Sequence, residues 1–358
     1  PLVGILAIGL GVLAVWKWRE SFSRSWERWV GAALLVMMAL SWVFSEAWAV
    51  GFSDYLAFSS AIILYLWLGF GDVQWKGRFL RVVIWGTGVA VLMGFLLYIF
   101  RDEVRMIGPF FNKLIHAHTW PNAFALFLLL TWPLGFLIEK RRWRVAFLSF
   151  SIAALFLTFS RGAMLVFAGQ VLLFAIARKW RWKEAVAVVI LVASLVVSAN
   201  FLRGLNFPLV DVGEKVAFEA DEGDQSKSDR LLFWQGGLDL ALDKPVLGWG
   251  PFSFREAYNG IEKELLQTAD HPHNLYLKLA AEYGFPVLIL FLLLLGANFV
   301  AAGRRWRQWD QETVVLGVAV LGALAHNMID YNLNFLANLL LLMTYLAFIR
   351  SKFLNKDK

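Results

Sequence analysis

The chain has 358 residues, of which 59% are hydrophobic and 17% are charged, and its mean hydropathy is +0.60. Because a soluble domain carries about 25% charged residues, this composition excludes an ordinary soluble protein and indicates a membrane protein. The formal net charge is +7, and the chain has no cysteine, which excludes disulfides and thiolate chemistry.

Apolar runs with almost no charge recur along the whole chain. An α-helix needs about 20 such residues to cross about 30 Å of hydrocarbon. The sequence therefore predicts an all-α polytopic membrane protein with about eleven transmembrane helices. Since a first span at Pro1 would place the N-terminus outside, we expect one more helix before it, which makes twelve. The expected spans are 1–16, 29–45, 55–71, 82–100, 114–138, 145–159, 162–177, 185–202, 283–303, 313–329 and 331–349.

The charge distribution predicts the orientation of these spans. Alternate connectors carry 22 Lys and Arg residues against 8 acidic ones, whereas the long 203–273 segment carries 7 against 13. Short loops rich in Lys and Arg stay in the cytoplasm, so we expect the 203–273 segment to be periplasmic. The net positive charge is therefore a topology signal, and we expect no binding to nucleic acid. The basic connectors are 17–28, 72–81, 139–144, 178–184, 304–312 and 350–358.

The chain is expected to form one membrane domain with one large insertion. Residues 1–202 would form transmembrane helices 1 to 8, and residues 274–358 would form helices 9 to 11 with a cytoplasmic tail. Residues 203–273 would be a periplasmic loop with short amphipathic helices, since a loop of this length usually carries function or is disordered. A helical pattern in this loop begins at Arg230, with Ser228 or Asp229 as its N-cap.

Two arginines on the expected outer side could bind an anion. Arg161 lies between two apolar runs, where an arginine is costly unless it snorkels, pairs with an acid or meets an anion. Arg230 offers a planar fork that suits a phosphate, and a helix N-terminus would add N–H groups. From these residues alone, contact of Arg161 with lipid headgroups stays open, as does pairing of Arg230 with Asp224 or Asp229.

A histidine pair lies at the end of the same loop, in His271-Pro-His273-Asn274. Histidine can accept and return a proton near neutral pH, so a general base is one interpretation, and helix capping or headgroup contact is the other. No third ligand lies at metal-binding spacing, so we expect no metal. Other polar residues near the outer face are His118, Asn122 and the corner of His326, Asn327 and Asp330, which we expect to be a helix-end network.

Two arginines and a histidine on one face predict an anion held beside a general base. The sequence has no GxxxxGK[ST] loop, no DxD pair and no HExxH motif. We therefore expect an enzyme without metal or cofactor, whose substrate carries its own activation as a pyrophosphate leaving group.

These motifs, in this order, resemble the O-antigen ligase and polymerase superfamily, which are polytopic glycosyltransferases. The first is Thr158-Phe-Ser-Arg161-Gly-Ala, and the second is Arg230-Leu-Leu-Phe-Trp-Gln with the following DKPVLGWGPF. The third is His273-Asn274 with Gly284 at the family's spacing, although Val287 replaces the family's last glycine. The stretch that ends in Trp-Pro-Asn122 looks like the family's asparagine-containing span.

The resemblance implies a GT-C-like fold and an inverting glycosyltransferase in the bacterial inner membrane with a periplasmic active site. Its donor would be a glycan on undecaprenyl pyrophosphate, and its acceptor a sugar hydroxyl, as in lipid A–core. The family pattern assigns Arg161 and Arg230 to the pyrophosphate and His273, not His271, to catalysis. Supporting roles would go to His271, Asn274, Asn122, His118 and His326.

Other readings stay open at this point. A polymerase would join lipid-linked repeats of O-antigen or capsule; we favour a ligase because we find a single His-Asn motif and no paired Arg-x15-Gly motif. A transporter or glycolipid flippase would show internal repeats and polar sites at mid-membrane. Here the spans are mostly free of charge, and the main intramembrane acid, Asp54, lies near the outer end of its span.

Overall fold

The computed structural model divides into two compact units, which are described separately below. The first unit comprises Pro1–Val73, Ala220–Arg307 and Asn327–Lys358, and the second comprises Gln74–Glu219 and Gln308–His326. The expected span at 1–16 lies outside the described residues. Within the two units the structure describes residues 26–46, 48–71, 73–112, 118–177, 181–211, 221–261, 269–305 and 308–354.

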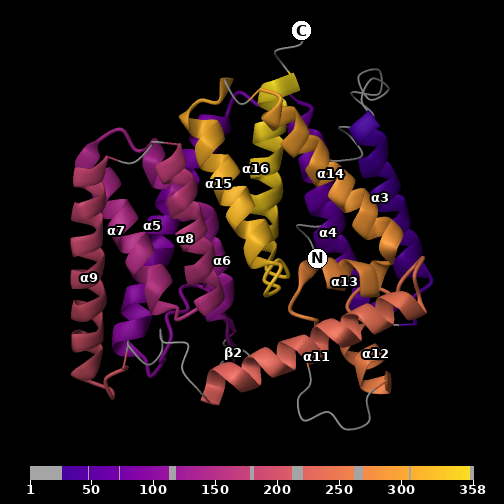
Figure 1. Ribbon diagram of the computed structural model, residues 1–358, viewed down its shortest axis with the longest axis horizontal. Helices are drawn as coiled ribbons and strands as arrows, with labels where there is room; N and C mark the ends of the chain where they lie inside the picture. Colours follow the sequence, from indigo (N-terminus) through magenta and orange to yellow (C-terminus); the bar gives the residue numbers. More distant parts are fainter. Residues whose placement is uncertain are drawn as a thin grey trace. The chain divides into compact units, whose positions relative to one another are not determined.

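The first unit is built from long apolar helices and a further set of helices near one end (Figure 1). Its long apolar helices are α3 (Trp26–Val43), α4 (Trp48–Gly69), α14 (Phe285–Gly303) and α16 (Leu336–Leu354). The others are α11 (Asp221–Asp243), α12 (Phe254–Ile261) and α13 (Leu275–Tyr283).

Within its described ranges the second unit is also helical, with one two-residue antiparallel ladder between β1 (Phe111–Asn112) and β2 (His118–Thr119). Its helices are α5 (Lys76–Phe100), α6 (Pro121–Thr131), the 3-10 helix η1 (Trp132–Leu137), α7 (Arg141–Leu157), α8 (Arg161–Ile176), α9 (Trp182–Gly204) and α15 (Gln311–His326).

Every expected span after the first contains a helix, so the prediction of an all-α membrane protein is confirmed. Five helices within the described ranges are long and apolar enough to cross a membrane, namely α4, α5, α9, α14 and residues Leu336–Phe353 of α16. Shorter apolar helices cover 121–137, 161–176 and 311–326. The count of eleven crossings stays a prediction.

The run 114–138 departs from the expected single span. Its described part begins with β2 and then forms α6 and η1. Pro121 stands in the first turn of α6, where its missing N–H leaves no bond unmade. Pro133 stands in the first turn of η1, which begins where α6 ends, because proline cannot continue an α-helical hydrogen-bond ladder.

The helix that contains Arg230 begins earlier than the sequence indicates. The expected N-cap was Ser228 or Asp229, but α11 begins at Asp221. Arg230 therefore lies in the middle of α11, and the expected anion site at a helix N-terminus is wrong.

A turn at residues 245–250 holds the C-terminal end of α13 in the first unit. The backbone N–H groups of Trp249 and Gly250 donate to the carbonyls of Ala281 (3.0 Å) and Glu282 (2.8 Å). Gly248 has φ +67°, and a Cβ there would lie 2.4 Å from the Glu282 backbone. Only glycine adopts this backbone conformation at so close an approach without strain, so the Gly-Trp-Gly sequence fixes where α13 ends.

Candidate functional site

In the first unit, His273 forms a short hydrogen bond with Asp330. The distance between His273 Nδ1 and Asp330 Oδ1 is 2.8 Å. The histidine side chain is 32% exposed, and the aspartate side chain is 8% exposed. His273 directly precedes the cap of α13, whereas Asp330 lies between α15 and α16, 57 residues later. The pair thus consists of a solvent-accessible imidazole backed by a buried carboxyl group.

The two segments that carry this pair are joined by further hydrogen bonds. Asn274 Nδ2 donates to the carbonyl of Met328 (2.8 Å), and the N–H of Leu275 donates to the carbonyl of Asn327 (2.9 Å). His273 has φ +48°, a left-handed conformation that a non-glycine residue rarely adopts. Strain of this kind persists only where the surroundings hold it, and it concentrates at functional sites.

Asn274 acts as the N-cap of α13. Its side-chain oxygen accepts from the N–H groups of Tyr276 (2.9 Å) and Leu277 (3.1 Å). Both polar atoms of its amide are therefore engaged in the protein. This geometry explains the Asn of the His-Asn motif as the residue that starts the helix and holds the Asp330 segment beside His273.

The hydrogen bond to Asp330 determines which nitrogen of His273 can act as a base. An ionised carboxylate only accepts hydrogen bonds, so it selects the imidazole tautomer that carries its proton on Nδ1. The Nε2 atom then keeps its lone pair. Asp330 Oδ1 also accepts from the N–H of Tyr331 (2.8 Å), which fixes the orientation of the carboxyl group. This is the arrangement of an oriented general base.

His271 has a different environment from His273. Its ring makes edge contacts with the rings of His273 (centroids 4.7 Å apart) and Tyr331 (4.9 Å). Burial, together with the nearby charge of His273, lowers the pKa of His271 to about 3. His271 is thus a neutral ring at working pH, and it supports the His273 side chain by packing.

Helix α11 brings Arg230 to the same part of the first unit. The ring of Phe233 on α11 lies 5.9 Å from the ring of His273. Arg230 precedes Phe233 by three residues, which places both on one face of the helix. Arg230 is partly buried there.

The remaining candidates lie in the second unit. Arg161 is the first residue of α8 and follows a tight turn in which Phe159 has φ +50°. Arg105 holds this turn: its Nε donates to the carbonyl of Thr158 (2.7 Å), and its Nη2 donates to Asn122 Oδ1 (2.6 Å).

Two further histidine candidates, His118 and His326, lie in the second unit. His118 lies in β2 and is exposed, with its ring 6.3 Å from that of Trp120. His326 ends α15 and is 1% exposed. A buried position at a helix end fits the expected helix-end network for His326 better than contact with substrate.

Comparison with known protein families decides what this chain is related to. Residues 145–292 match the model of the family described as O-antigen ligase. This match supports the resemblance of the chain to the O-antigen ligase and polymerase superfamily. The segment that matches this O-antigen ligase family contains Arg161, Arg230 and His273. No match was found among curated proteins.

One partner of a candidate residue in each unit was not identified from the sequence. Asp330 was considered only as part of the corner after His326. Its separation of 57 residues from His273 gives no indication in the sequence that the two side chains meet. Nothing in the sequence distinguishes Arg105 from the other charged residues of the 101–113 segment. The one available hint was a charged residue next to apolar runs, which in a membrane protein requires a partner.

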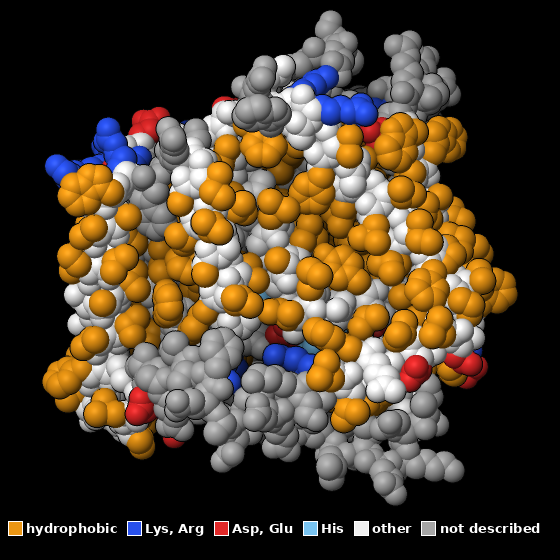
Figure 2. All heavy atoms as spheres, viewed as in Figure 1, with side chains coloured by type: hydrophobic (Ala, Val, Ile, Leu, Met, Phe, Trp, Pro, Cys, Tyr) orange, Lys and Arg blue, Asp and Glu red, His pale blue; other side chains and the backbone are white. Residues whose placement is uncertain are grey.

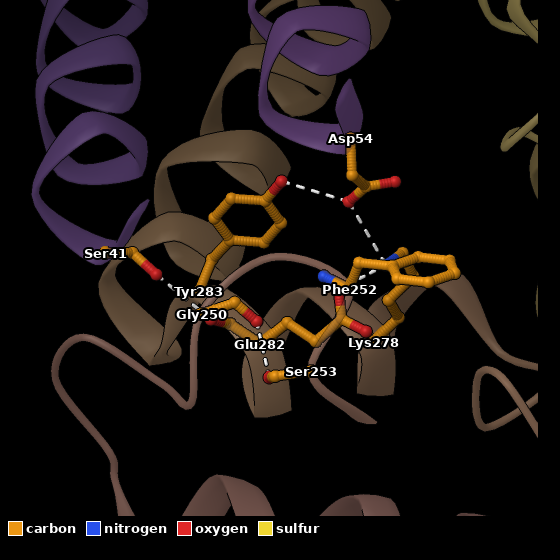
Figure 3. Close-up of polar contacts among 8 residues, drawn as sticks. All are labelled: Ser41, Asp54, Gly250, Phe252, Ser253, Lys278, Glu282 and Tyr283. Carbon is orange, nitrogen blue, oxygen red and sulfur yellow. Dashed lines mark hydrogen bonds and ion pairs between the residues drawn. The ribbon is translucent and has the colours of Figure 1, made fainter. Parts of the chain in front are cut away.

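A buried ionic cluster lies at α13 of the first unit, close to the start of α4 (Figure 3). Lys278 Nζ donates to Asp54 Oδ2 (3.2 Å) and to Glu282 Oε2, and Tyr283 Oη donates to Asp54 Oδ2 (3.1 Å). Lys278 and Glu282 are 1% and 0% exposed. Glu282 also accepts from the N–H of Phe252 (2.9 Å). The cluster therefore joins α4, α13 and the turn that follows Gly250.

The cluster contains two carboxyl groups and one ammonium group. Burial lowers the pKa of Lys278, but Asp54 and Glu282 more than offset this, so the net pKa of Lys278 is raised. Burial raises the pKa of Glu282 to about 7, against the opposing effect of Lys278 and with a contribution from Asp54. The cluster thus approaches neutrality when Glu282 holds a proton.

We expect this cluster to make the stability of the protein depend on pH. A folded-state pKa near 7, above the ordinary 4.5, means that the stability present below pH 4.5 is lost as pH rises through 7. Replacing Glu282 with Gln removes this titration while keeping the side chain's size. The melting temperature in detergent should therefore fall between pH 5 and pH 8 more steeply for the wild type than for Glu282→Gln. Parallel slopes would contradict the assignment.

Proposed function

We propose that this protein is an inverting glycosyltransferase that moves a glycan from undecaprenyl pyrophosphate to a sugar hydroxyl of lipid A–core on the periplasmic face of the inner membrane. The observation that carries the proposal is the oriented His273–Asp330 pair, whose histidine lies in the segment that matches the O-antigen ligase family. The match to the O-antigen ligase family supports a ligase or polymerase type of transfer, and the single His-Asn motif favours the ligase.

In the proposed reaction, His273 Nε2 accepts the proton of the acceptor hydroxyl. The hydroxyl oxygen then forms the new bond to the anomeric carbon of the donor sugar. The bond between this carbon and the pyrophosphate oxygen breaks, and the electron pair leaves with the pyrophosphate. Attack opposite to the leaving group inverts the anomeric centre.

Arg161 and Arg230 are proposed to bind the donor pyrophosphate, as their places in the family's motifs imply. Guanidinium groups can contact phosphate oxygens through two parallel hydrogen bonds and keep their charge at any working pH. They would offset the negative charge that develops on the leaving group in the transition state. Replacement of either arginine with Lys keeps the charge but removes the fork, so we expect a partial loss; Gln should give a greater loss.

A reconstituted transfer assay tests the proposed function. Purified protein in liposomes would receive a glycan on undecaprenyl pyrophosphate, with and without lipid A–core, and the products would be separated by mass. A ligase gives glycan linked to lipid A–core. Lengthening of the lipid-linked glycan without lipid A–core would indicate a polymerase, and movement of the donor across the bilayer without transfer would indicate a flippase. Either of these two results would overturn the proposal of a ligase.

A further inference from the structure

Helix α14 of the first unit has a face that does not pack into the helix bundle. Its buried residues include Val287, Phe291 and Asn298. A second set of residues, three or four positions apart along the helix, forms a stripe on another face of α14. This stripe lines a cavity of about 710 Å³. The members of this stripe that matter here are Ile289, Leu292, Leu293, Gly296, Val300 and Arg304.

The apolar stripe along this cavity is long enough for a lipid chain to lie against it. Ile289 is 54% exposed and Val300 is 53% exposed, so both apolar side chains face out of the protein. At Gly296 an added Cβ would meet no atom within 4 Å, so the glycine leaves open space in the wall. From Ile289 to Arg304 the helix rises about 22 Å, which exceeds one leaflet of a hydrocarbon core of about 30 Å.

The cavity ends in an excess of positive charge. Its lining contains Arg304, Arg305 and Arg350, with Glu27 as the single acidic residue. Arg350 Nη2 bonds Glu27, and Arg305 Nη1 donates to the carbonyl of Phe353. The Arg350 side chain is 9% exposed, and its buried Nε has no hydrogen-bond partner in the part of the chain that the structure describes.

Arg304 lies at the end of the stripe and is exposed. Trp26, 55% exposed, lines the cavity at the same end. A Trp ring is amphipathic and favours the depth of lipid headgroups. Figure 2 shows Lys and Arg side chains where α14 and α16 end, beside a broad hydrophobic surface on α14. The cavity is therefore apolar along its length and basic at the headgroup level.

We propose that this cavity is a binding site for an anionic glycerophospholipid. One acyl chain would lie along the stripe over Gly296, and the phosphate would contact Arg304, Arg305 and Arg350. Arginine binds phosphate through charge-assisted hydrogen bonds, and the negative charge of the lipid complements a lining that contains three arginines and one acidic residue. A zwitterionic phospholipid fits less well because its own ammonium group already balances its phosphate. This site does not depend on the proposed transfer activity.

Native mass spectrometry of the purified full chain tests this proposal. The delipidated protein would be mixed with equal amounts of phosphatidylglycerol and phosphatidylethanolamine in mild detergent. We expect phosphatidylglycerol to remain bound at collision energies that remove phosphatidylethanolamine. Equal retention of the two lipids would overturn the proposal, and so would displacement of phosphatidylglycerol by an equal concentration of a polyprenyl phosphate.

Two variants and two matched controls locate the site. Gly296→Leu fills the open space without changing charge, and Arg304→Gln removes the exposed cation; each should lower the bound fraction of phosphatidylglycerol several-fold. The controls are on α5, where Gly88 also faces open space and Arg78 is also exposed. Gly88→Leu and Arg78→Gln should leave binding unchanged. Full binding by Gly296→Leu, or an equal loss in the controls, would overturn the site.

Discussion

Replacing Asp330 with Asn is expected to lower the rate of glycan transfer by about 10²–10⁴-fold, close to the effect of removing the base itself in His273→Gln. An amide in place of the carboxylate can donate to Nδ1 of His273, which favours the tautomer with its proton on Nε2. That tautomer cannot accept the proton of the acceptor hydroxyl. The loss should appear in kcat, while KM for the donor glycolipid changes little, because Asp330 positions the base and does not touch the donor.

The control for this experiment is Asp270→Asn. Asp270 directly precedes His271 in the sequence, but its side chain is 54% exposed and pairs with Arg255 at the surface (3.1 Å). Removing its charge should leave kcat within about twofold, since exposed ion pairs contribute little. Full transfer activity in a well-folded Asp330→Asn protein would show that the hydrogen bond to His273 has no role in the reaction. A fall in KM alone would also contradict the positioning role.

Replacing Lys278 with Met is expected to destabilise the protein by about 3–5 kcal/mol, which is the range for breaking a buried ion pair. The variant leaves Asp54 and Glu282 buried without their shared cation. The measurement is the loss of monomer after heating in detergent. Because His273 and Asn274 lie one turn before Lys278 along the chain, we expect transfer activity to be lost together with the fold.

A variant in which the whole cluster is neutral distinguishes two causes of destabilisation, namely the lost ion pair and the lost lysine side chain. The triple variant Asp54→Asn, Lys278→Met and Glu282→Gln contains no uncompensated charge and should recover much of the stability. The single-site control is Lys244→Met, because Lys244 is 39% exposed and its partner Glu46 is 90% exposed. It should cost about 1 kcal/mol or less. A triple variant no more stable than Lys278→Met would show that packing of the lysine stem, not its charge, holds α13.

The sequence predicted the helices well wherever local composition decides them. An apolar run must satisfy its backbone within itself when it enters a bilayer, and only a helix does so within one segment. Runs such as 82–100 and 185–202 therefore became α5 and α9 without any information from elsewhere in the chain. The motif spacing also favoured His273 over His271 as the base, which stays a prediction; in the structure, burial lowers the pKa of His271.

The sequence was less informative where a boundary depends on several weak signals. The start of α11 was placed at Arg230, because the polar residues before it resembled a loop, yet the helix continues back to Asp221. Polar residues can extend a helix whose apolar end is already held by packing, since propensity differences among ordinary residues are small. The expected helix is present in the structure, but it begins nine residues earlier than predicted, so Arg230 does not lie at its N-terminus.

The amino-acid sequence was enough to predict apolar helices, to show which family the chain resembles, and to propose residue types that could bind an anion or accept a proton. The partners of these residues became visible only in the folded chain. Asp330 reaches His273 across 57 residues, and Asp54 reaches Lys278 across 224. Such pairs leave no periodic trace in the chain, because a contact between segments distant in sequence depends on how the helices pack. A buried charge shows only that a partner must exist; the fold shows which residue it is.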